Sequence, residues 1–159
     1  MIIETLADHD LADFTSGAVE LDDWLRRRGA KAHEAGDAVV RLAIADGHKV
    51  VGFHALCAGS IERSFAAGAL RRNAPDPIPV LVLARLAVDL AAQGCGVGVE
   101  LLADVAKRSV SAAEMVGFRA LVVHCRDDNA LAFYRRWLPV EALPSNPLHV
   151  YIPIRRLRV

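Results

Sequence analysis

The sequence predicts an α/β protein in which helices cover a mixed β-sheet, and two observations carry this prediction. Residues 80–136 alternate between buried β-branched runs and helical patterns, an order that requires parallel pairing of strands. Residues 39–59 instead hold two apolar runs joined by Asp46-Gly47-His48, and an Asp-Gly turn joins antiparallel strands. A sheet with both kinds of pairing is mixed, and its apolar faces require helices to cover them.

Length and composition predict one domain, 1–159, with a core of its own. The apolar fraction of 53% and the mean hydropathy of +0.27 exclude a disordered chain. No apolar run reaches the roughly 18 residues of a membrane span, and no signal peptide is visible, so we expect neither. Cys57, Cys95 and Cys125 fit neither a zinc site nor a disulfide framework, which predicts a reduced, cytoplasmic protein without a bound metal.

The formal net charge of zero gives no global attraction to nucleic acid, but the charges are unevenly distributed. Residues 1–23 hold seven acidic residues and no Lys or Arg. The basic residues are 16 Arg and 3 Lys, and several arginines occur in adjacent pairs or triplets. Arginine suits bidentate contacts with phosphate. The alternative for any one run is a solvated surface with weak ion pairs.

The first half of the chain predicts a strand, a long helix and a hairpin. We expect a strand over Ile2–Leu6 and a helix from Val19 to Ala35 that ends at Gly36. The hairpin strands cover residues 39–45 and 49–59.

The middle of the chain predicts irregular structure. Residues 66–72 suit a short helical turn, and three prolines at alternate positions exclude regular structure over residues 73–79. A loop of this length in a small domain is often functional.

The second half of the chain predicts a β-α-β-α-β order. Strands are expected over residues 80–89, 119–125 and 149–154. One helix is expected over residues 96–116, and a second runs to about Arg136 after an N-cap at Asp127 or Asp128.

A glycine-rich turn, Gln93-Gly94-Cys95-Gly96-Val97-Gly98, joins a strand to a helix. Such a turn presents backbone N–H groups at the positive end of a helix dipole, which favours a bound phosphate or pyrophosphate. A dinucleotide-binding loop does not match, because it comes early in the chain and spaces its glycines differently. A P-loop does not match either, because no Lys-Ser/Thr follows. A turn with a purely structural role remains the alternative.

Together with Phe133-Tyr134 on a later helix, this turn resembles the GNAT acyl-CoA N-acetyltransferase superfamily. The chain is most similar to one branch, the GNAT toxins of bacterial type II toxin–antitoxin systems. The block that carries this closer resemblance is Leu70-Arg71-Arg72-Asn73-x-Pro75-Asp76-Pro77-Ile78-Pro79-Val80. Further matching segments are Phe14-x-Ser16-Gly17, Leu21-Asp22-Asp23-Trp24-Leu25, Val50-Val51-Gly52-Phe53-x-Ala55-Leu56 and Arg85-Leu86-Ala87-Val88-Asp89.

The resemblance implies the GNAT fold, an α/β (α+β) arrangement with a mixed, mostly antiparallel sheet of about six to seven strands and about four flanking helices. It implies acetyl-CoA as co-substrate, with no metal. The backbone of Leu86, Ala87 and Val88 would bind the pantetheine and the acetyl group. Backbone amides of the turn would bind the pyrophosphate: Gln93, Gly94, Cys95, Gly96, Val97 and Gly98. Tyr134 would be the general acid that protonates the CoA thiolate.

The resemblance also implies a substrate and partners. In toxin-type members the acceptor is the α-amine of aminoacyl-tRNA, and Arg71 and Arg72 are the first candidates for contacts with tRNA phosphates. A small DNA-binding antitoxin and a homodimer are the expected protein partners.

Two departures from the family pattern affect the turn. Members often carry Arg where this chain has Cys95, and the preceding loop is often basic where this chain has Leu90-Ala91-Ala92. Both remove positive charge beside the pyrophosphate. Two alternatives therefore stay open: a housekeeping enzyme that acetylates a small amine or a protein amine, and an inactive CoA-binding interaction module. His54, His124 and His149 lie in strand-like runs and are interpreted as structural or wall residues.

Overall fold

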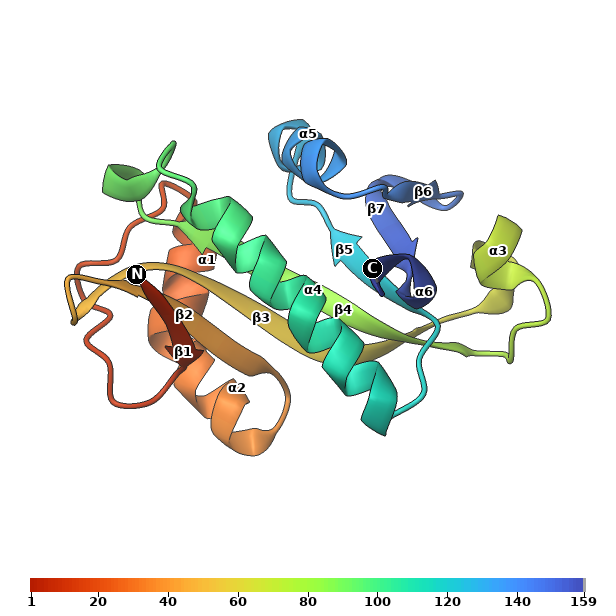
Figure 1. Ribbon diagram of the computed structural model, residues 1–159, viewed down its shortest axis with the longest axis horizontal. Helices are drawn as coiled ribbons and strands as arrows, with labels where there is room; N and C mark the ends of the chain where they lie inside the picture. Colours follow the sequence, from red (N-terminus) through yellow and green to blue (C-terminus); the bar gives the residue numbers. More distant parts are fainter. Residues whose placement is uncertain (159) are drawn as a thin grey trace. The chain divides into compact units, whose positions relative to one another are not determined.

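The computed structural model describes residues 1–158, which form two compact units (Figure 1). Unit 1 comprises Met1–Cys57 and Ala84–Val105, and unit 2 comprises Ala58–Leu83 and the chain from Ala106 onward. Strands β3 (Lys49–Ile61) and β4 (Ile78–Val88) and helix α4 (Val97–Met115) each pass from one unit into the other. That all 159 residues act as a single domain stays a prediction.

The strands form a seven-stranded mixed sheet with the order β1-β2-β3-β4-β5-β7-β6. The strands not yet given are β1 (Ile2–Thr5), β2 (Val39–Ala45), β5 (Ala120–His124), β6 (Glu141–Leu143) and β7 (Asn146–Pro153). Strands β4 and β5 pair in parallel, whereas the β1–β2, β2–β3, β5–β7 and β6–β7 pairs are antiparallel. The predicted fold class is therefore confirmed.

The first helical segment of unit 1 runs over the predicted residues 19–35 but is not a uniform α-helix. Helices α1 (Val19–Trp24) and α2 (Ala30–Ala35) flank a π-helical turn, Leu25–Gly29. The segment ends at Gly36, whose φ of +80° is left-handed and whose N–H donates to the carbonyl of His33. Sequence patterns predict the length of this helix but not its wider turn.

Unit 1 buries both faces of its strands, because the alternating side chains of β2 point to opposite sides. Val40, Leu42 and Ile44 pack with Leu25 and with the partly buried Trp24, on the side of α1 and α2 (Figure 1). On the other face, Ala43 and Val51 pack with Val97 and Leu101 of α4. These contacts place the first turns of α4 against the strands of unit 1.

The hairpin between β2 and β3 has the predicted turn. Asp46 and Gly47 have φ angles of 54° and 77°, and His48 N–H donates to the carbonyl of Ala45. Positive φ at both central residues matches the twist of the strands, which is why Asp-Gly occurs here.

Unit 2 contains β5 between β4 and β7, together with three helices. These are α3 (Gly68–Arg71), α5 (Asp128–Trp137) and α6 (Ile154–Leu157). The carboxylate of Asp127 accepts from the N–H of Ala130 over 2.9 Å, so Asp127 is the N-cap of α5. No helix within residues 1–158 is long and apolar enough to cross a membrane.

Two predictions for unit 2 are wrong. Ile78 and Pro79 belong to β4, although the prolines predicted irregular structure through residue 79. Pro79 lies at the start of the strand and is exposed, where a missing N–H costs little, and its carbonyl accepts from Arg119 N–H. The hairpin of β6 and β7 was predicted only as a final strand from His149, because Pro144 and Pro147 interrupt its pattern.

Candidate active site

The last residues of β4 lead directly into the glycine-rich turn, all within unit 1. Leu86, Ala87 and Val88 end the strand, and a single 3₁₀ turn over Leu90–Ala92 follows. The Asp89 carboxylate caps this turn through Ala91 N–H at 3.0 Å and also accepts from Thr15 N–H at 3.1 Å. One buried carboxylate thus fixes the point at which the chain leaves the sheet.

The turn requires glycine for its backbone conformation. Gly94 and Gly96 have φ angles of +79° and +86°, in the left-handed region that most side chains disfavour. A Cβ atom at either position would meet no atom within 4 Å, so crowding by the protein is not the reason for glycine. The open space beside both residues leaves the backbone accessible to a ligand.

The backbone N–H groups of the turn are only partly used by the protein. Gln93 N–H donates to Leu90 over 3.4 Å, and Cys95 N–H donates to Ala92 over 3.3 Å. Within residues 1–158, no acceptor is found for the N–H groups of Gly94, Gly96, Val97 and Gly98. They lie at the N-terminus of the 19-residue helix α4, where the dipole adds positive potential. This arrangement suits an anion with several oxygen atoms, such as a diphosphate.

The Gln93 side chain holds the turn in place through two hydrogen bonds. Its Nε2 donates to the carbonyls of Ser16 and Val88, each over 3.0 Å. Ser16 is itself fixed by Asp22, which accepts from the Ser16 hydroxyl at 2.6 Å and from its N–H at 2.9 Å. Sequence reasoning predicted only a backbone role for Gln93 and missed these side-chain hydrogen bonds. The sequence signal for them is the Ser16-Gly17 and Asp22 motif near the N-terminus.

A buried charge network attaches α4 to the strands of unit 1. The Asp104 carboxylate lies 2.8 Å from Arg41 Nε and 2.7 Å from His54 Nε2, and His54 is fully buried. Burial by itself raises the pKa of Asp104. Hydrogen bonds from His54 and Arg41, and the charge of both, outweigh it and hold the pKa below its usual value. This confirms a structural role for His54.

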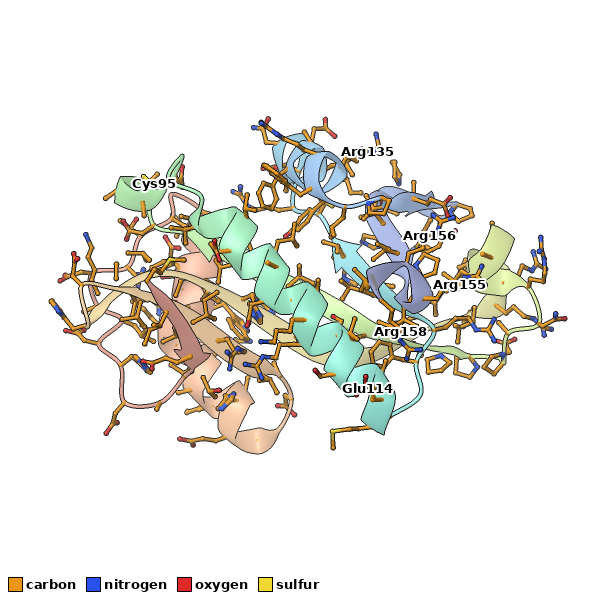
Figure 2. All side chains as sticks on the ribbon, in the orientation of Figure 1. Cys95, Glu114, Arg135, Arg155, Arg156 and Arg158 are labelled. Atoms are coloured by element: carbon orange, nitrogen blue, oxygen red, sulfur yellow. The ribbon has the colours of Figure 1, made fainter. Side chains whose placement is uncertain are left out.

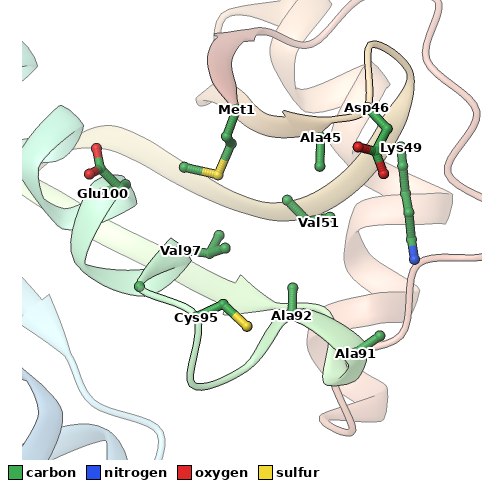
Figure 3. Close-up of a pocket in the computed structure, with 11 residues that line it drawn as sticks. Met1, Ala45, Asp46, Lys49, Val51, Ala91, Ala92, Cys95, Val97 and Glu100 are labelled. Atoms are coloured by element: carbon green, nitrogen blue, oxygen red, sulfur yellow. The ribbon is translucent and has the colours of Figure 1, made fainter.

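A pocket of about 640 Å³ lies beside the turn in unit 1 (Figure 3). Met1, Val51 and Val97 form apolar parts of its wall, and Cys95 lies on the side of the turn. Its charged side chains are Lys49, Asp46 and Glu100, and Met1, the N-terminal residue, also lines it.

Tyr134 lies in the middle of α5, in unit 2, and its side chain is buried. Its ring contacts that of Phe133 edge to face, with 5.2 Å between centroids. Burial, and to a lesser extent the thiol of Cys125, raises the pKa of Tyr134 well above its usual value. Its hydroxyl has no hydrogen-bond partner within residues 1–158. A phenolic hydroxyl that bonds no protein group can donate to a ligand.

Arg71 and Arg72 lie at the end of α3, in unit 2, and both are exposed. The structure therefore divides the predicted residues between the units. The strand end and the glycine-rich turn belong to unit 1, whereas Tyr134 and the two arginines belong to unit 2. His124 and His149 also lie in unit 2, on paired strands, with their rings stacked at 4.2 Å.

Residues 3–138, from the first strand to the end of α5, match the sequence model of the Acetyltransferase (GNAT) family. The chain belongs to this family. It is 44% identical over 149 residues to the tRNA-acetylating toxin of Mycobacterium tuberculosis (strain ATCC 25618 / H37Rv). That alignment covers 94% of this chain and 89% of the relative. The GNAT resemblance of the sequence is thereby confirmed.

Solved structures of KacT and AtaT have the same fold. A KacT variant, in which a tyrosine is replaced by phenylalanine, has a TM-score of 0.90 and 25% identity, covering 99% of this chain and 96% of that one. AtaT complexed with acetyl-methionyl-tRNAfMet has a TM-score of 0.88 and 26% identity, with the same coverage. AtaT with an analogous tyrosine-to-phenylalanine change, bound to acetyl-CoA and to the C-terminus of the antitoxin AtaR, has a TM-score of 0.84 and 26% identity, covering 99% and 95%.

Proposed function

We propose that this GNAT enzyme is a toxin that transfers the acetyl group of acetyl-CoA to the α-amine of aminoacyl-tRNA and thereby blocks translation. The observation that carries the proposal is the 44% identity to a tRNA-acetylating toxin across 94% of the chain. The unused N–H groups of the glycine-rich turn support the donor side of the reaction, because acetyl-CoA carries a diphosphate.

Acetyl-CoA fits the residues of unit 1. The N–H groups of Gly94, Gly96, Val97 and Gly98 hold the pyrophosphate, and the backbone of Leu86–Val88 holds the pantetheine and the acetyl carbonyl. The turn N–H groups of Gln93 and Cys95 contribute less, because each already has an acceptor within the turn. When bound, acetyl-CoA supplies a thioester whose carbonyl carbon accepts the amine.

The transfer uses one proton donor and no metal. The amine nitrogen attacks the thioester carbonyl carbon, and a backbone N–H near Val88 stabilises the oxyanion that forms. The carbon–sulfur bond then breaks, and Tyr134 gives its phenolic proton to the CoA thiolate. The nitrogen loses its own proton to solvent, and solvent returns a proton to the Tyr134 phenolate. Burial favours the neutral phenol, so Tyr134 carries the proton that this step consumes.

The acceptor side needs no strong base in the protein. A free α-amine has a pKa of about 8, so a useful fraction is unprotonated at neutral pH. Arg71 and Arg72 are exposed guanidinium groups at the end of α3 and contact the phosphates of the tRNA. AtaT has been solved with an acetylated aminoacyl-tRNA, which supports the same acceptor class here.

Two protein partners belong to the proposal. AtaT has been solved with part of its antitoxin AtaR, and AtaT–AtaR with DNA, which supports a small DNA-binding antitoxin for this chain. A homodimer is proposed from the family resemblance. Light scattering of the purified protein, alone and with the product of a neighbouring small gene, measures both stoichiometries.

Growth of an expressing bacterium tests the proposal. Induction of the wild-type chain arrests growth, and co-expression of the neighbouring antitoxin restores it. Purified enzyme incubated with labelled acetyl-CoA labels charged tRNA but not deacylated tRNA. Transfer to polyamines or lysine peptides, with charged tRNA unlabelled, would favour the housekeeping alternative. Binding of acetyl-CoA without any transfer would favour the inactive module.

A further inference from the structure

The zero net charge of the chain conceals a division between the two units. Unit 2 has twelve Lys and Arg residues against six Asp and Glu, a formal charge of +6. Unit 1 has seven against thirteen, a formal charge of −6. Arg155, Arg156 and Arg158 follow β7 in unit 2, and Arg135 lies on α5 of the same unit (Figure 2). A polyanion is therefore attracted to unit 2 and repelled by unit 1.

Within unit 2, three arginines from the ten-residue segment 63–72 share one surface depression. Arg63, Arg71 and Arg72 line it together with Gly68, and its volume is about 490 Å³. All three arginines are exposed, and no carboxylate of residues 1–158 lines the depression. None of the three makes an ion pair within residues 1–158. Within residues 1–158, three arginines without an ion-pair partner therefore line one depression.

The surrounding loop is held in a defined shape. Arg63 Nη1 donates to the Ala74 carbonyl over 3.4 Å, and its backbone N–H donates to the Asp76 carboxylate over 3.1 Å. From the other side, Arg119 donates to the carbonyls of Arg72 at 3.0 Å and Asn73 at 3.2 Å. Ala74 is buried and anchors the segment between them. The depression is therefore ordered by hydrogen bonds before any ligand arrives.

We propose that Arg63, Arg71 and Arg72 form one phosphate-binding site that takes a backbone phosphate of the tRNA. Guanidinium groups donate in pairs to phosphate oxygens, and three of them surround a single phosphodiester group. Arg63 is thereby a tRNA-binding residue that the sequence did not reveal, and Arg119 is a positioning residue that shapes the loop. This inference rests on the proposed acceptor, aminoacyl-tRNA, and adds to it a defined contact.

Steady-state acetylation of aminoacyl-tRNA by Arg63→Ala tests the site. Loss of one charged contact raises the KM for tRNA about tenfold, while kcat stays unchanged. The slope of log(kcat/KM) against log salt becomes shallower by about one. Arg63→Lys, which keeps the charge, recovers part of the loss. The matched control is Arg27→Ala, an exposed arginine of unit 1, which changes neither quantity.

Three results would contradict the proposed phosphate-binding site. One is an unchanged KM for tRNA in Arg63→Ala, and the second is an equal loss in the Arg27→Ala control. The third is a raised KM for acetyl-CoA in place of tRNA, which would assign the depression to a phosphate of the co-substrate. Melting temperatures of all variants confirm that each is folded.

Filter binding of deacylated tRNA separates this inference from the proposed function, because it needs no acetyl transfer. If the wild type binds tRNA and Arg63→Ala binds it about tenfold more weakly, the site stands whatever the acceptor of the acetyl group is. If both proteins bind tRNA equally, or neither does, the site is refuted even if transfer to aminoacyl-tRNA is observed.

Discussion

The side-chain amide of Gln93 donates to the backbone carbonyl of Ser16 over 3.0 Å, across 77 residues of sequence. The same amide group donates to the carbonyl of Val88 at the end of β4. One side chain thus connects the N-terminal loop, the strand end and the glycine-rich turn. Since the turn N–H groups have to point at a pyrophosphate, this brace determines their direction.

Gln93→Met, which keeps the size of the side chain but not its donors, is expected to weaken acetyl-CoA binding. Two hydrogen bonds at about 1 kcal/mol each correspond to an increase in Kd of between tenfold and thirtyfold. Isothermal titration with acetyl-CoA measures this change, and the melting temperature shows whether the fold is intact. An unchanged Kd would mean that the turn holds its shape without the brace.

Tyr134→Phe is expected to lower kcat by about 10²-fold or more, the usual contribution of a general acid. The Kd for acetyl-CoA stays at the wild-type value, because the proposed pyrophosphate site belongs to the turn. The ring fills the same volume, and the lost hydroxyl bonds no other group within residues 1–158, so stability is preserved. Near-normal turnover by this variant would remove Tyr134 from the mechanism. Tyr151→Phe in β7 is the matched control and keeps kcat unchanged.

The kcat/KM of the wild type should rise with pH as the acceptor amine loses its proton. It should show no descending limb from Tyr134 below pH ~10. Burial raises the pKa of Tyr134, so the neutral phenol persists beyond its ordinary titration range. Because the pKa of Tyr134 is higher in the folded state than in the unfolded state, Tyr134 stabilises the fold at pH values below its unfolded pKa. This stabilisation is lost as the pH rises through the pKa of the folded state. We expect kcat/KM to increase through pH ~8 and then reach a plateau. A descending limb near neutral pH that vanishes in Tyr134→Phe would contradict the assignment.

Asp104→Ala is expected to lower the free energy of unfolding by about 3–5 kcal/mol, because it leaves Arg41 and His54 buried around a missing carboxylate. Asp37→Ala, at an exposed position, changes it by less than about 0.5 kcal/mol. The lowered pKa of Asp104 stabilises the fold above pH ~4, and this contribution is lost as the pH falls through the folded pKa. Urea unfolding from pH 7 to pH 3 measures both effects. Equal stability of Asp104→Ala and Asp37→Ala would show that the network is not needed.

Cys95→Arg is expected to strengthen acetyl-CoA binding about fivefold, because it restores a positive charge beside the pyrophosphate. Cys95 is exposed, so the longer side chain causes no overpacking. Cys95→Ala serves as the control and leaves the Kd unchanged. The gain should diminish at high salt, since an exposed charge is screened. An unchanged Kd for acetyl-CoA in Cys95→Arg would place the pyrophosphate away from residue 95.

Local patterns predicted the parts of the fold that depend on near neighbours. The helix over residues 19–35, the Asp46-Gly47 turn and the Asp127 cap each depend on residues a few positions apart. The β6–β7 hairpin could not be predicted, because Pro144 and Pro147 conceal two strands that tertiary pairing stabilises.

Local sequence patterns predicted even less of the candidate site than of the fold. The glycine-rich turn was recognised from its spacing, but Tyr134 was assigned only through the family resemblance. The contacts of Gln93 with Ser16 and of Asp104 with His54 connect residues far apart in sequence. Single-sequence patterns carry no information on such pairs, because they arise only when the chain folds.

The most direct test of the central claim is the mass of the 3′-terminal aminoacyl-adenosine after enzyme, acetyl-CoA and charged tRNA have reacted and the tRNA has been digested. The account predicts an increase by one acetyl group on the amino acid for the wild type. It predicts no increase with Tyr134→Phe over the same time, and none on adenosine from deacylated tRNA. An unmodified aminoacyl-adenosine from wild-type enzyme that binds acetyl-CoA would contradict it.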